Sequence, residues 1–167
     1  MNNGIEKRVL PACLVFFLCL LATQAEAAAT ITMTESQAMT FPTLALPSTG
    51  SSTLTISALS SATSGTAHIV SGTASRAIYA LVSKGGGSTS ISIDIGSVST
   101  GSSYLTLSNF TGLYNGVTIG SFPSKTLSLP AVKPGSTPLY VGATLTALSG
   151  LATGNYAMSY TITITVL

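Results

Sequence analysis

The chain has 167 residues, of which 46% are hydrophobic and only 6% charged, with a formal net charge of +2. Hydrophobic residues that are this frequent and regularly spaced exclude a disordered low-complexity chain. So few charges cannot form a basic patch, and they exclude nucleic acid as a partner.

The first predicted element is a secretory signal peptide over residues 1–27. Lys7 and Arg8 form a basic start, Val9 to Ala22 form an apolar run, and Ala25-Glu26-Ala27 supplies the small-x-small cleavage pattern. A run of fourteen residues is shorter than the about 20 that a membrane-crossing helix needs. We therefore expect a single exported domain of residues 28–167, without a membrane span. Both cysteines precede residue 28, so the mature chain would have no disulfide.

The mature chain is predicted to consist of β-strands. Apolar residues alternate with small polar ones in runs that Gly, Pro, Ser and Asn clusters separate, and no long run shows a helical period. The predicted strands cover residues 30–34, 52–57, 68–70, 77–81, 90–95, 104–110, 125–129, 139–145 and 156–166. This pattern predicts an all-β, immunoglobulin-like antiparallel β-sandwich of about eight or nine strands.

Two of these runs carry a more specific expectation. Runs 77–81 and 90–95 are predicted to form a hairpin whose loop contains Lys84-Gly85-Gly86-Gly87. In run 104–110, Leu105 and Leu107 are expected to face inward, with Phe110 following a bulge.

The last run is the longest, because every even position from Tyr156 to Val166 is apolar. A terminal strand must pair, and an unpaired apolar one favours pairing with another chain. We expect Ile162 and Ile164 in the core, and Ile31 and Met33 either covering the same domain or docking into a neighbour. The candidate strand-pairing residues are Ile31, Met33, Gly154, Tyr156, Met158, Tyr160, Ile162, Ile164 and Val166.

The sequence offers little for catalysis or metal binding. His68 and Asp94 could complete a triad with one of many serines, but no serine lies in a G-x-S-x-G elbow. One histidine and two separated carboxylates cannot fill a zinc shell, and no calcium loop is present. The sequon Asn109-Phe110-Thr111 is interpreted as accidental. We expect no enzymatic activity, no cofactor and no metal.

The order of several segments resembles a family of small secreted bacterial domains of unknown function, often described as pilin-like. They are Met39-Thr40-Phe41, the stretch from Leu44 to Ile56, Leu105 to Phe110, Leu139 to Leu145, and Gly154-Asn155-Tyr156 with the terminal strand. The chain is more distantly similar to chaperone–usher fimbrial subunits, in which a glycine at the place of Gly154 precedes the terminal strand. It differs from them at Val166, where their penultimate tyrosine stands, and lacks the disulfide that many of them carry.

The resemblance implies a structural or surface subunit of a bacterial cell envelope, pilus- or fimbria-like, that assembles by strand exchange. Its implied partners are other copies of itself, related pilus subunits, a periplasmic chaperone and an usher. The expected location is the periplasm, the cell surface or the extracellular space. The alternative is a self-contained secreted or periplasmic module that binds a ligand, such as a glycan, through its loops. Exposed aromatic residues would favour that alternative, but the chain has no Trp and only six Tyr.

Overall fold

The computed structural model describes residues 30–60, 62–84, 90–120, 122 and 135–167. The described part forms eleven β-strands and no helix, which confirms the all-β prediction. The strands are β1 (Thr30–Gln37), β2 (Thr43–Leu44), β3 (Ser51–Ile56), β4 (Thr63–Gly65), β5 (Ile69–Ser71), β6 (Ala77–Lys84), β7 (Ile91–Ser99), β8 (Leu105–Tyr114), β9 (Val117–Ile119), β10 (Gly135–Leu148) and β11 (Ser159–Val166). The predicted signal peptide, run 125–129 and the triglycine lie outside the described residues.

The strand count exceeds the expected eight or nine because the structure adds short strands. Strands β2, β4 and β9 have only two or three residues each. So few residues show no alternation that a sequence pattern could reveal.

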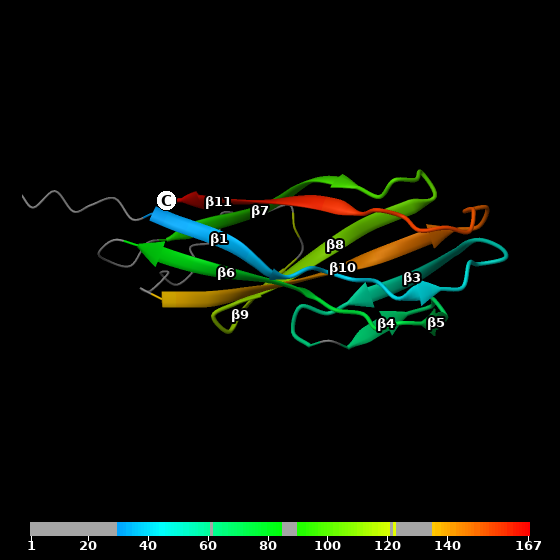
Figure 1. Ribbon diagram of the computed structural model, residues 1–167, viewed down its shortest axis with the longest axis horizontal. Helices are drawn as coiled ribbons and strands as arrows, with labels where there is room; N and C mark the ends of the chain where they lie inside the picture. Colours follow the sequence, from blue (N-terminus) through cyan, green and yellow to red (C-terminus); the bar gives the residue numbers. More distant parts are fainter. Residues whose placement is uncertain (1–29, 61, 85–89, 121, 123–134) are drawn as a thin grey trace, which may run out of the picture.

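The large sheet has seven strands arranged around the long central strand β10 (Figure 1). One edge of β10 pairs first with β6, over residues 135–141, and then with β3, over residues 144–148. Its other edge pairs with β8, which continues to β9. The edge strands β1 and β4 extend β6 and β3. All these pairings are antiparallel.

The change of partner along β10 occurs at Gly142. A Cβ atom there would overlap the carbonyl oxygen of Ile56 and lie 2.6 Å from the backbone nitrogen of Ala58. The end of β3 therefore passes directly over β10 at a position where only glycine fits.

Strand β8 has the bulge that was predicted before Phe110. Asn109 has a φ of 48°, and the pairing with β10 shifts register at this point. The buried positions consequently change from Leu105 and Leu107 to Phe110, Gly112 and Tyr114. The extra residue keeps the inner face of β8 apolar on both sides of the bulge.

A second sheet consists of β7 and β11, and a third of β2 and β5. The core contains the buried side chains of β6, β7, β8 and β10, so the two-stranded β7–β11 sheet packs against the large one. This is the predicted sandwich architecture, with sheets of very unequal width.

The predicted hairpin of runs 77–81 and 90–95 is wrong. Strand β6 pairs with β1 and β10, whereas β7 pairs with β11 in the other sheet. Both strands bury alternate side chains, such as Leu81 and Ile93. They thus contribute to the core from opposite layers, and they do not lie side by side.

Candidate functional site

The terminal strand β11 is an edge strand. Among the described strands it pairs only with β7, with Ile162 opposite Ile95 and Ile164 opposite Ile93. Those two β7 isoleucines are buried, but their β11 partners are only half-buried. The predicted core position of Ile162 and Ile164 is therefore corrected: both pack against the core without being enclosed by it.

Tyr160 of β11 contacts two strands of the large sheet, β6 and β8. Its hydroxyl group is 2.9 Å from the hydroxyl of Tyr79 on β6, the neighbour of β1. The Tyr160 ring also packs on the ring of Phe110 on β8, with 5.3 Å between the ring centroids. Tyr160 thus fixes β11 over the large sheet, while the second edge of β11 pairs with no other described strand.

Burial is the main reason why the pKa of Tyr160 lies above its ordinary value. The hydrogen bond with Tyr79 and the negative charge of Glu35 on β1 raise this pKa further. Burial likewise raises the pKa of Tyr79, which the hydrogen bond to Tyr160 partly offsets. Both phenols are therefore neutral hydrogen-bonding groups at neutral pH.

Strand β1 lies at an edge of the large sheet among the described strands. It pairs antiparallel with β6, placing Ile31 opposite Ser83 and Met33 opposite Leu81. Ile31 is half-buried against the core, Met33 is 37% exposed, and the other positions of β1 are exposed. In this structure β1 pairs within its own domain and Ile31 packs against the core. Docking of Ile31 and Met33 into a neighbour stays a prediction.

The predicted strand from Tyr156 begins later, at Ser159. Gly154, Tyr156 and Met158 precede it, and no backbone hydrogen bond joins residues 152–158 to the rest of the described chain. Gly154 has no left-handed φ, and a Cβ there would approach only the Tyr156 ring, at 4.0 Å. The backbone therefore does not require glycine at position 154.

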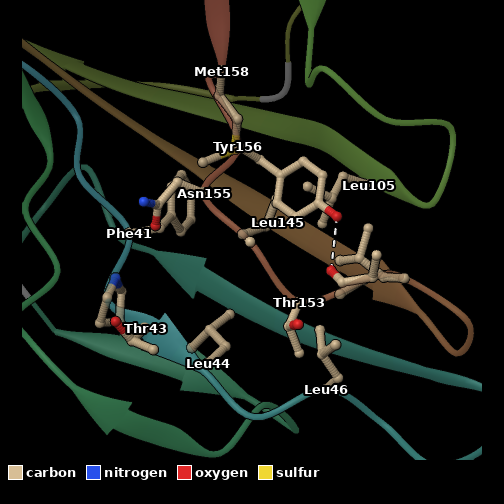
Figure 2. Close-up of a pocket in the computed structure, with 15 residues that line it drawn as sticks. Phe41, Thr43, Leu44, Leu46, Leu105, Leu145, Thr153, Asn155, Tyr156 and Met158 are labelled. Atoms are coloured by element: carbon tan, nitrogen blue, oxygen red, sulfur yellow. Dashed lines mark hydrogen bonds between the residues drawn. The ribbon is translucent and has the colours of Figure 1, made fainter.

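Tyr156 and Met158 instead line an open pocket of about 350 Å³ (Figure 2). One wall is the stretch 41–46 around β2, and the other is the segment 151–158 before β11. The floor contains Leu105, Leu145 and Ala147, from the β8 and β10 strands. The Tyr156 hydroxyl donates a 2.7 Å hydrogen bond to the carbonyl of Ala152, which holds the ring across the pocket (Figure 2).

Sequence reasoning missed this pocket. Its walls are about 110 residues apart in the chain and belong mainly to irregular segments, for which no periodicity exists. The only signal was the apolar residue Phe41, next to Pro42 and outside any predicted strand.

The residues considered for catalysis lie apart in the fold. His68 precedes β5 in the small sheet and Asp94 lies on β7, and both are exposed. Within the described ranges, no three His, Cys, Asp or Glu side chains form a group that could hold a metal ion. Asn109 of the sequon is exposed at the β8 bulge.

No helix in the described part of the chain is long and apolar enough to cross a membrane. No curated protein and no solved structure matches the chain. A family model does match, over residues 31–166, which is nearly all of the described region and includes every strand residue except Thr30. The chain therefore belongs to the family described as a domain of unknown function, DUF4402.

Proposed function

We propose that this protein is a non-catalytic structural or surface subunit of a bacterial cell envelope, pilus- or fimbria-like, which assembles by strand exchange. The observation that carries the proposal is the edge of β11 with which no other described strand pairs. Three inward side chains on this strand, Tyr160, Ile162 and Ile164, are half-buried, and Val166 is 45% exposed. A strand added at this edge would gain main-chain hydrogen bonds and cover that apolar row.

Strand β1 is the segment best suited to be exchanged between copies. It is the first described strand of the chain and contacts one neighbouring strand, β6. The side chains of its inward residues Ile31 and Met33 are themselves partly exposed. Withdrawing β1 from the sheet would therefore expose little apolar area that is now buried. A neighbouring copy could restore equivalent contacts, which is the physical basis of strand and domain swapping.

Deletion of residues 28–34 from the mature protein tests the proposal. We expect the wild-type protein to form fibres or multimers in electron microscopy and light scattering, and the deletion variant to stay folded without assembling. Met33→Asp should weaken assembly, because Met33 lies on the inward face opposite Leu81. Its matched control, Thr32→Asp, places the same charge one position along, opposite Val82 and on the outer face, and should assemble normally.

A stable wild-type monomer at high concentration would contradict the proposal, particularly if the deletion merely lowered its melting temperature. The second candidate function, a self-contained secreted or periplasmic ligand-binding module, would then be favoured. The observation in its favour is the pocket beside β2, whose volume lies in the range that is usual for small-molecule sites. A periplasmic chaperone and an usher are proposed as partners only in the assembling case.

A further inference from the structure

The pocket between segments 41–46 and 151–158 is too large to be a packing defect. Its volume of about 350 Å³ lies within the range of roughly 300–1,000 Å³ that is usual for small-molecule sites. A cavity of that size would hold on the order of ten water molecules, each occupying about 30 Å³ in the liquid. It opens at the surface, so a ligand has a path of entry (Figure 2).

The lining of the pocket defines the chemistry of what would bind there. Leu105, Leu145 and Ala147 form an apolar floor, and the rings of Phe41 and Tyr156 lie on opposite walls. None of the charged residues in the described part of the chain lines the pocket. A charged ligand would lose hydration here without gaining an ion pair, so the lining selects a neutral one.

Polar side chains lie on the walls above this floor. Thr43 comes from β2, whereas Thr153 and Asn155 come from the segment before β11. The described structure shows no hydrogen-bond partner for any of these three side chains. Their hydroxyl and amide groups are therefore available to a ligand, and they can both donate and accept.

We propose that this pocket binds a small uncharged amphiphile, with its apolar part on the leucine floor and its hydroxyl groups at Thr43, Thr153 and Asn155. The proposal goes beyond assembly and does not depend on it, because the floor belongs to β8 and β10 and not to the open β11 edge. The site is partly fixed in advance: the hydrogen bond to Ala152 fixes the Tyr156 ring relative to its own segment, and pairing of β2 with β5 holds the other wall. Such preorganisation favours binding.

The test uses n-octyl-β-D-glucoside below its micelle concentration as the probe, with the mature protein and detection by calorimetry and NMR. We expect the glucoside to bind saturably and to shift the NMR signals of pocket residues. Octanoate, which is charged, and glucose, which lacks the alkyl chain, should each bind at least tenfold more weakly. Ala147→Leu should narrow the floor and weaken binding at least tenfold. Its matched control, Ala38→Leu, is at an exposed position outside the lining and should bind normally.

Ala147 is buried, so a larger side chain there also affects the packing of the core. Leu46→Asp therefore provides a second variant, which adds a charge at a partly exposed residue of the lining. It too should weaken binding of the glucoside. Absence of saturable binding, equal binding of octanoate or glucose, or unchanged affinity in both folded variants would overturn the proposal. A further contrary result would come from a synthetic peptide of residues 30–37. If this peptide shifted the NMR signals of the pocket residues and the glucoside did not, the pocket would be assigned to assembly. Assembly itself is measured separately by light scattering, so the two proposals can fail independently.

Discussion

Gly142 shows how one residue permits the architecture of the large sheet. At this position β10 passes from pairing with β6 to pairing with β3, and the backbone of residues 56–58 crosses it. Any side chain would meet backbone atoms on that segment, and backbone cannot move aside as a flexible side chain could.

Gly142→Ala is therefore expected to lower the free energy of unfolding by about 1–3 kcal/mol or more. The matched control is Gly96→Ala, on strand β7, where a Cβ atom would meet nothing within 4 Å. We expect the control to change stability by less than about 0.5 kcal/mol. Urea unfolding followed by circular dichroism gives both values. Equal stability of the two variants would show that the crossing segment can relax away from β10.

At the scale of elements, β7 and β11 differ although both alternate regularly. Ile93 on β7 is 3% exposed, whereas its direct partner Ile164 on β11 is half-buried. The two strands of one sheet thus bury their inner faces to different extents. An apolar alternation therefore marks the inner face of a strand but does not say how well that face is covered.

This difference predicts unequal costs of truncation at two paired positions. Ile93→Ala should destabilise the monomer by about 2–5 kcal/mol, and Ile164→Ala by less than about 2 kcal/mol, because a half-buried side chain loses less on removal. Urea unfolding of both variants under non-assembling conditions provides the measurement. If an added strand covers this edge, Ile164→Ala should assemble less well than Ile93→Ala. Equal destabilisation of the monomer would mean that the β11 edge is already closed.

At the scale of the whole molecule, the described part of the chain combines an apolar core with a surface of hydroxyl-bearing residues and few charges. Without a disulfide in its predicted mature form, the domain would depend on that core alone for stability. Such a chain suits an exported protein that keeps its sheets soluble through Ser and Thr.

Export predicts a defined mature species. Mass spectrometry of protein from the cell envelope should give a chain that begins at Ala28 and contains no thiol. Ala27→Phe should leave the precursor uncut, because the cleavage pattern requires a small residue at that position. Ala29→Phe, beyond the site, serves as the control and should be processed. An intact Met1 in the wild-type protein, or a lipid attached to Cys19, would contradict the expected processing.

The sequence alone determined the all-β class and the inward face of most long strands. Alternation at Leu54 and Ile56, at Ile91 to Ile95 and at Leu139 to Leu145 corresponds to buried positions in the structure. Even the bulge before Phe110 was visible as a break in that alternation. These features are local, because the side-chain period of a strand is fixed by its own backbone.

Which strands pair, and which side chains remain uncovered, became clear from the folded arrangement alone. Runs 77–81 and 90–95 belong to different sheets, and Ile162 and Ile164 are half-buried although their partners on β7 are buried. The pocket likewise needs segments 41–46 and 151–158 to meet across the β8 and β10 strands. Partner choice and coverage depend on contacts between residues far apart in the chain, and a local period contains no information about them.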